Sequence, residues 1–209
     1  PQEICDYSKP PFAKWFKGGE TNLCHNAIDR HLKDRGDQAA LIFVSTETDQ
    51  EVTYTYKQLH AEVQRMAASL LSLGVKKGDR VLIYMPMIAE ASFAMLACAR
   101  IGAIHSVVFG GFASGSLASR IEDASPKVIV SADAGSRGGK VVVYKPLLDE
   151  AIRLSSHKPD SVVLVERGLA SMDITEGRDL LWSTLREKHM NDVVPCEWVD
   201  ATHPSYTLF

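Results

Sequence analysis

Residues Ala103–Ser114, with the sequence AIHSVVFGGFAS, decide the fold of this chain. The run Ile104–Phe109 is apolar apart from two positions and rich in β-branched residues, which predicts a strand buried on both faces, as in parallel α/β sheets. Ligands of such sheets gather at the carboxyl ends of the strands. Gly110 and Gly111 stand at that end, where backbone N–H groups with no Cβ beside them approach a phosphate closely. A tight strand-to-helix turn without a ligand is the open alternative, because the spacing is not the dinucleotide-binding fingerprint.

The sequence downstream of residue 80 alternates between strand and helix patterns. Strands are predicted over residues 81–85, 104–109, 128–132, 141–144 and 161–165, and helices over residues 89–101, 114–124 and from Pro146 onwards. Short turns between such elements are typical of a doubly wound sheet with right-handed crossovers. The predicted fold class is therefore α/β with a doubly wound, mainly parallel sheet. One helix is predicted within the loop-rich residues 166–204, over residues 180–188.

The first residues differ from this body. Residues 1–36 combine aromatic side chains with proline and glycine pairs and then show a helical pattern over Asn22–Lys33, so we predict an arm that packs on the body, residues 37–209. The body begins with a hairpin of strands over residues 39–45 and 52–55. Thr55-x-x-Gln58 is a capping-box pattern, so a helix begins there, and Gly74 ends it. Its predicted buried face is apolar at helical spacing: Leu59, Val63, Met66, Ala67, Leu70 and Leu71.

Composition excludes several classes of function. The net charge is −3, from 23 Lys and Arg against 26 Asp and Glu with no basic block, so we expect small-molecule partners and no nucleic acid. The most apolar region, residues 87–109, is interrupted by charged residues, so no membrane span is expected. The four cysteines are scattered without Cys-x-x-Cys spacing, which argues against a zinc site and a disulfide scaffold. A reducing cytoplasm is the expected location.

Arg137-Gly138-Gly139-Lys140 places two cations across a glycine pair after a predicted strand. A guanidinium offers a planar fork of donors to phosphate oxygens and a lysine offers a mobile charge, so this stretch is a candidate anion site. A solvated loop is the alternative. His105 lies within a strand and is predicted to be a core histidine with satisfied hydrogen bonds. No Ser-His-Asp or Cys-His arrangement can be assigned, and we predict no catalytic residue and no metal ligand in this chain.

Several stretches closely resemble the acetyl/propionyl-CoA synthetases, which are adenylate-forming acyl-CoA ligases. The resemblance spans almost the whole chain, and the Arg-Gly-Gly-Lys form is most similar to the propionate-activating branch. The stretches that carry it are residues 24–32, 84–87, 96–112, 131–134 and 137–140. It implies that residues 37–209 are the first α/β subdomain of a large adenylation domain. The phosphate-binding loop of the family would follow Tyr206–Phe209, and we expect the protein to continue there.

The resemblance implies a reaction in two steps. A carboxylate, propionate, attacks the α-phosphate of ATP, with Mg²⁺ expected beside the ATP, and CoA then displaces AMP to give the thioester. It implies that Phe109, Gly110 and Gly111, with Arg137, Gly138, Gly139 and Lys140, hold the nucleotide end of CoA, the two cations near its 3′-phosphate. Lys140 is a departure, because acetate-specific members usually have arginine there.

Three alternatives to a propionate-activating enzyme stay open. The chain is compatible with an acetyl-CoA synthetase, with a CoA- or nucleotide-binding module that has no reaction of its own, and with a structural α/β domain whose glycines only form turns. Because the adenylation residues of the family fall outside these 209 residues, we expect this chain to be inactive by itself. The sequence gives no indication of the oligomeric state.

Overall fold

A six-stranded sheet, in the order β12-β11-β8-β6-β7-β14, forms the centre of the molecule. The computed structural model describes residues 1–209. All neighbouring strands of this sheet pair in parallel. The strands are β6 (Arg80–Met85), β7 (Ile104–Phe109), β8 (Val128–Ala132), β11 (Ser161–Val165), β12 (Asp179–Leu181) and β14 (Tyr206–Thr207).

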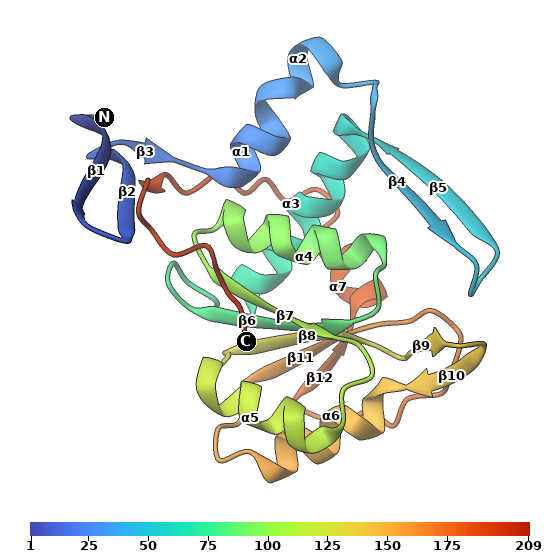
Figure 1. Ribbon diagram of the computed structural model, residues 1–209. Helices are drawn as coiled ribbons and strands as arrows, with labels where there is room; N and C mark the ends of the chain where they lie inside the picture. Colours follow the sequence, from blue (N-terminus) through green and yellow to red (C-terminus); the bar gives the residue numbers. More distant parts are fainter.

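Helices cover both faces of the sheet. Figure 1 shows α3 (Tyr56–Ser72), α4 (Ala89–Arg100) and α7 (Trp182–Lys188) on one face and α5 (Ser114–Ala124) and α6 (Tyr144–Leu154) on the other. The predicted doubly wound parallel α/β fold is therefore confirmed. Each strand and the helix that follows it form this arrangement for the same reason. The apolar strand and the apolar face of the helix are both buried only when the helix packs back on the sheet.

The core lies around the central strands, and β7 departs from it. Residues 81–85 of β6 and all of β8 are buried, as expected for strands covered on both faces. The predicted burial of both faces of β7 is wrong, since Phe109 is 60% exposed and Val107 is 40% exposed. The helices α5 and α6 contact β6 and β8 in the middle of the sheet, so this face of β7 stays open next to the two-residue strand β14.

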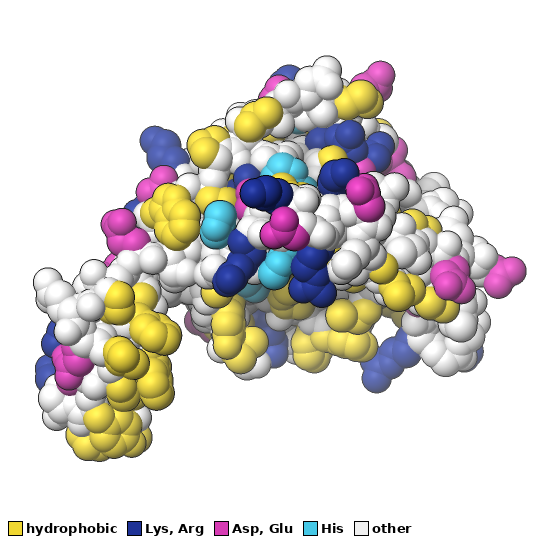
Figure 2. All heavy atoms as spheres, turned by 90° about the horizontal axis from the view of Figure 1, so that it is seen from above, with side chains coloured by type: hydrophobic (Ala, Val, Ile, Leu, Met, Phe, Trp, Pro, Cys, Tyr) yellow, Lys and Arg dark blue, Asp and Glu magenta, His cyan; other side chains and the backbone are white.

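The arm predicted over residues 1–36 consists of two parts. The strands β1 (Glu3–Lys9) and β2 (Phe12–Lys17) form an antiparallel hairpin that projects from the body (Figure 1). Hydrophobic side chains gather along one side of it (Figure 2). Phe12 and Trp15 are 78% and 56% exposed. The second part packs on the body through α1, which contacts α4.

The continuous helix predicted over Asn22–Lys33 is wrong. The chain forms three short pieces, α1 (Leu23–Ala27), a 3-10 turn η1 (Asp29–His31) and α2 (Leu32–Arg35). Ile28, between the first two pieces, is buried and leaves helical geometry with φ −127° and ψ −64°. Before α1, the strand β3 (Glu20–Thr21) pairs with β13 (Val199–Asp200). The tertiary contacts of this segment override its helical pattern.

The hairpin and the long helix that follow are confirmed. The strands β4 (Ala39–Ser45) and β5 (Gln50–Thr55) pair antiparallel. The capping box of α3 is complete: Thr55 Oγ1 accepts from the Gln58 N–H at 3.3 Å, and Gln58 Oε1 accepts from the Thr55 N–H at 2.9 Å. The predicted buried face of α3 is confirmed except at Leu71, which is 43% exposed.

The substitution Thr55→Ala is expected to destabilise the protein by about 1 kcal/mol, because the Gln58 N–H loses its acceptor at the helix start. The measurement is urea-induced unfolding followed by far-ultraviolet circular dichroism. Thr184→Ala is the matched control, since Thr184 is exposed on α7, and its effect should stay within about 0.5 kcal/mol. Equal effects of the two substitutions would contradict a stabilising role for the capping box.

Two elements near the end of the chain differ from the prediction in different degrees. The helix predicted over residues 180–188 begins only at Trp182, because Asp179–Leu181 form β12 and pair with β11. Hydrogen bonds to the sheet edge outweigh the local helical pattern there. The strand predicted over Tyr206–Phe209 is confirmed for Tyr206 and Thr207, which pair with His105 and Ser106 of β7.

Candidate functional site

The first half of the predicted site is the turn that ends β7. Phe109 is the last residue of the strand and is exposed, Gly110 is buried, and Gly111 has a φ of +97°. This φ value favours glycine, because an L side chain is strained there. The Phe109 ring meets the Phe112 ring edge-on, with centroids 6.2 Å apart. The turn therefore presents an aromatic face and a glycine backbone at the carboxyl end of the sheet.

The second half of the predicted site is a hairpin. The strands β9 (Ala134–Arg137) and β10 (Lys140–Val143) pair antiparallel, with Arg137 opposite Lys140. The loop predicted up to Lys140 and the strand predicted over residues 141–144 are therefore wrong in detail. Gly138 and Gly139 have φ values of +57° and +76°, the conformation that two-residue hairpin turns require. This turn holds both cations, which are exposed, at the tip of the hairpin.

The two halves meet at Tyr144, the first residue of α6. A Cβ added at either Gly110 or Gly135 would overlap the Tyr144 hydroxyl, so both backbones approach this side chain as only glycine allows. A Cβ at Gly111 would lie 3.9 Å from Val142 Cγ1 of β10. Because Lys140 is two residues beyond Val142, the cationic tip extends about 7 Å further along the strand. The structure thus brings the glycine turn and the root of the cationic hairpin together.

Two acidic side chains that sequence reasoning did not assign hold the root of the hairpin. The buried Asp133 carboxylate accepts from the N–H groups of Ala134 at 2.6 Å, Arg167 at 3.1 Å and Leu169 at 2.9 Å. Glu47, from the turn between β4 and β5, accepts from the Ser136 N–H at 2.8 Å and pairs with Arg167. The one available signal was the position of Asp133 directly after a fully buried strand.

His105 is not placed for acid–base chemistry. Its ring packs on Tyr206 with centroids 5.8 Å apart, and burial lowers its pKa. Nδ1 is buried without a hydrogen-bond partner, so the prediction of a core histidine with satisfied hydrogen bonds is wrong in that respect.

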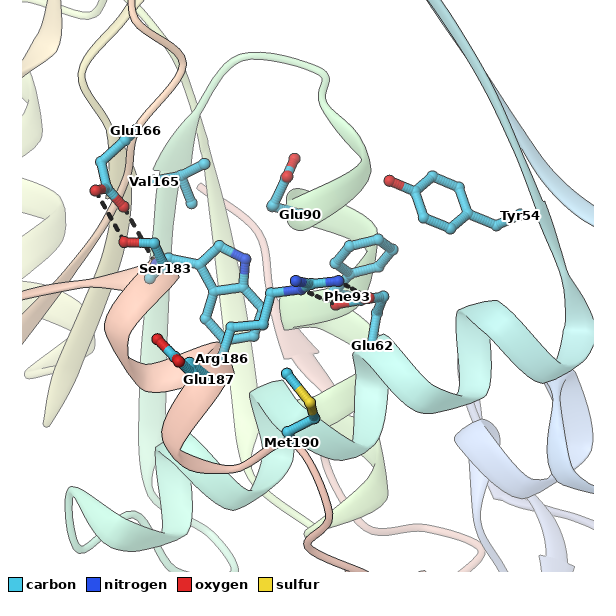
Figure 3. A pocket seen from close by; sticks show the side chains of 11 residues that line it. Tyr54, Glu62, Glu90, Phe93, Val165, Glu166, Ser183, Arg186, Glu187 and Met190 are labelled. Atoms are coloured by element: carbon cyan, nitrogen blue, oxygen red, sulfur yellow. Dashed lines mark hydrogen bonds and ion pairs between the residues drawn. The ribbon is translucent and has the colours of Figure 1, made fainter.

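A separate cavity of about 530 Å³ lies between α3, α4 and α7 (Figure 3). The Glu62 carboxylate accepts from Arg186 Nε at 2.7 Å, and Glu166 accepts from the Ser183 hydroxyl at 2.9 Å. Burial raises the pKa of Glu90. The carboxylates outnumber the single arginine on the walls, so the cavity disfavours a nucleotide or another anion. Its charged lining residues are Glu62, Glu90, Glu166, Glu187 and Arg186.

None of the helices combines the length and the apolar character needed to cross a membrane.

The doubly wound parallel sheet, with a glycine turn and a cationic hairpin meeting at its carboxyl edge, defines an α/β domain with the form of a nucleotide-binding protein. The chain belongs to the AMP-binding enzyme family, whose model matches residues 28–209. The model of the acetyl-coenzyme A synthetase N-terminus matches residues 1–27. The resemblance drawn from the sequence is thus confirmed at the level of the family.

Similar proteins include two propionate–CoA ligases and an acetyl-coenzyme A synthetase. The propionate–CoA ligase of Salmonella typhimurium is 60% identical over 99% of this chain and 33% of its own length, and that of Escherichia coli is 58% identical with the same coverage. The acetyl-coenzyme A synthetase of Methylobacterium radiotolerans is 50% identical over 94% of this chain and 30% of its own length. The chain therefore spans about a third of the length of these relatives.

Proposed function

We propose that the whole protein is an ATP-dependent ligase that joins propionate to CoA. The propionate carboxylate attacks the α-phosphate of ATP, which gives propionyl-AMP and pyrophosphate, and the CoA thiolate then displaces AMP to give propionyl-CoA. The identity of 60% to a propionate–CoA ligase over nearly the whole chain supports this reaction. Residues 37–209 would form the first α/β subdomain of the adenylation domain, and residues 1–36 its N-terminal arm.

The part of the reaction that we assign to this chain is the binding of the nucleotide end of CoA. The observation that carries this assignment is the meeting of the glycine turn with the hairpin that presents Arg137 and Lys140. The Arg137 guanidinium suits two oxygens of the 3′-phosphate, and Lys140 adds a second positive charge. The exposed Phe109 ring offers a surface on which the adenine base stacks, and the backbone of Gly110 and Gly111 leaves room for that approach.

The other substrates are assigned to the rest of the protein. ATP with Mg²⁺ and the propionate chain would bind to residues outside these 209, including the adenylation residues. We place the reaction in the cytoplasm, with small molecules as its partners. No carboxylate or histidine of this chain is assigned a catalytic step.

The substitution Arg137→Ala is expected to weaken CoA binding by about 1.5–3 kcal/mol, the typical value of a hydrogen bond to a charged group. Calorimetric titration of the whole protein with CoA and with dephospho-CoA measures this. Dephospho-CoA lacks the 3′-phosphate, so its affinity should hardly change. Arg153→Ala is the matched control, because Arg153 is an exposed arginine paired with Glu150 on α6. Equal losses for both ligands would contradict the 3′-phosphate assignment.

The chain of residues 1–209 is expected to be inactive by itself, because no residue in it is assigned to adenylation. The measurement is propionate-dependent exchange of pyrophosphate into ATP by the purified chain, with the whole protein as the positive control. Exchange above background by the chain alone would contradict this expectation and would locate the adenylation site within these residues.

An acetyl-coenzyme A synthetase is the second candidate, favoured by the 50% identity to such an enzyme. The ratio of kcat/KM for propionate and acetate, measured on the whole protein, separates the two. A CoA-binding module without a reaction of its own predicts CoA binding with no thioester formed from either acid.

A further inference from the structure

Two cysteines that are far apart in the sequence lie side by side in the structure. The Sγ atoms of Cys24 and Cys196 and a carboxylate oxygen of Asp29 all lie within 4.8 Å of one another. Cys24 belongs to α1 and is fully buried, whereas Cys196 is half-buried in the segment before β13. Neither forms a disulfide. The scattered spacing of the cysteines gave no indication of this pair.

The backbones that carry the two cysteines are held close by other contacts. Asn22, next to α1, donates from Nδ2 to the carbonyl oxygens of Glu197 and Ala99, both at 2.8 Å. Val199 of β13 pairs with Thr21 of β3. The two Sγ atoms therefore lie within 4.8 Å of each other in the folded chain without a disulfide between them, whereas the S–S distance in a disulfide is about 2 Å.

Arg100 lies beside this pair and is itself paired with Asp29. Its guanidinium is 3% exposed and lies 3.4 Å from Cys24 Sγ and 2.9 Å from Asp29 Oδ2. The neighbouring Cys24 thiol lowers the pKa of Cys196 by hydrogen bonding, and Arg100 acts in the same direction. The hydrogen bond with Cys196 and burial raise the pKa of Cys24, so Cys196 is the cysteine that favours the thiolate, which is the form that reacts with oxidants.

The same cation argues against a metal ion in this cluster. Two cysteines and an aspartate are a donor set that zinc accepts. The Arg100 guanidinium, however, already contacts two of the three groups, so its charge would repel a divalent ion placed between them.

We propose that Cys24 and Cys196 are a peroxide-reactive pair that closes to a disulfide. The half-buried Cys196 thiolate attacks one oxygen of hydrogen peroxide, the O–O bond breaks, and a sulfenic acid and hydroxide form. The sulfur of Cys24 then attacks the sulfenic sulfur, the S–S bond forms, and hydroxide leaves. This second hydroxide takes up the proton that Cys24 releases and becomes water. Two thiols and one peroxide become one disulfide and two waters, and both electrons pass from the thiols to the peroxide.

The other two cysteines provide internal controls. Cys98 is fully buried in α4, and burial raises its pKa to about 12, so it should not make the first attack on peroxide. Cys5 lies in β1, on the hairpin that β1 forms with β2. The disulfide would join the segment of α1 to the segment of β13, and it leaves the glycine turn and the cationic hairpin untouched.

The test treats the purified whole protein with an equal concentration of hydrogen peroxide and blocks free thiols by alkylation under denaturing conditions. Mass spectrometry of the intact chain and of its peptides is the readout. The expected result is the loss of two hydrogen atoms and a cross-linked peptide that contains Cys24 and Cys196, both reversed by dithiothreitol. Cys196→Ser should abolish the cross-link, and Cys5→Ser should leave it unchanged. Thermal unfolding of the oxidised chain should shift upwards, because the link closes a long loop.

Three other results would overturn the proposal. The first is a sulfinic or sulfonic acid at Cys196 with Cys24 still open to alkylation. The second is a cross-link through Cys5 between two chains. The third is one zinc ion per chain that copurifies with the protein and is lost in Cys196→Ser, which would make the cluster a metal site. Since the unsubstituted chain gives the cross-linked peptide directly, a variant that fails to fold does not weaken the test.

Discussion

Replacement of Arg100 with alanine is expected to lower the free energy of unfolding by about 3–5 kcal/mol, the usual cost of removing one partner from a buried ion pair. The Arg100 Nη2 atom donates to Asp29 at 2.8 Å, and Nε donates to the Val194 carbonyl at 2.6 Å. Burial alone would raise the pKa of Asp29, but hydrogen bonds from His60 and Arg100 hold it below its usual range. Without Arg100, the Asp29 carboxylate and the Val194 carbonyl lose their strongest donor together.

Urea-induced unfolding of the chain measures this effect. Arg153→Ala is the control, because the pair of Arg153 with Glu150 is exposed on α6, and its loss should cost less than about 1 kcal/mol. The double variant Arg100→Ala with Asp29→Asn should recover part of the loss, since no charge is then left unpaired. A loss below about 1 kcal/mol in Arg100→Ala would show that the pair contributes no more than a surface pair does.

Replacement of Asp133 with alanine is also expected to have a large effect, a destabilisation of about 3 kcal/mol. The Asp133 side chain is 1% exposed, and it accepts hydrogen bonds from the N–H groups of Ala134, Arg167 and Leu169. A buried donor left without a partner, such as the Ala134 N–H, costs about 1–3 kcal/mol, and the part-buried N–H groups of Arg167 and Leu169 cost less. The start of β9 and the segment from Arg167 would separate, so the hairpin that carries Arg137 should become mobile.

Hydrogen exchange of backbone amides distinguishes this local effect from a general loss of stability. Protection should fall first in residues 134–143 and 167–170, in addition to the change in urea-induced unfolding. Asp123→Ala is the matched control, because Asp123 is exposed on α5, and its effect should stay within about 0.5 kcal/mol. Unchanged protection of the hairpin in Asp133→Ala would contradict the anchoring role of this carboxylate.

The glycines of the candidate site are required by the fold, so their presence is not by itself evidence of a ligand. Gly110 is required beside the Tyr144 hydroxyl, and Gly138 and Gly139 are required by the hairpin turn. Each of these reasons holds without any ligand. The distinguishing feature of the site is therefore its two exposed cations, and the comparison of CoA with dephospho-CoA is aimed at them.

Elements whose cause is local could be predicted from the sequence. The capping box of α3 uses residues three positions apart, and the bounds of β7, β8, β11 and α5 follow from apolar runs and their flanking turns. The same local patterns predicted the doubly wound sheet, because each strand and the helix after it bury each other. The stretches that resemble the acyl-CoA synthetases are also continuous in the sequence, and for this reason the family could be predicted.

Elements whose cause lies elsewhere in the chain were decided by the tertiary structure. The helical pattern at Leu180 and Leu181 gave way to pairing with β11, and the open face of β7 depends on where α5 and α6 pack. Two partners of Asp133, Arg167 and Leu169, are more than thirty positions away. Cys24 lies near Cys196 in a region where Asn22 and β3 connect the two segments. A local sequence pattern determines which conformation a segment prefers. The hydrogen-bonding partners of that segment in the folded chain come from distant segments. Where the local preference and these hydrogen bonds conflict, the buried hydrogen bonds prevail.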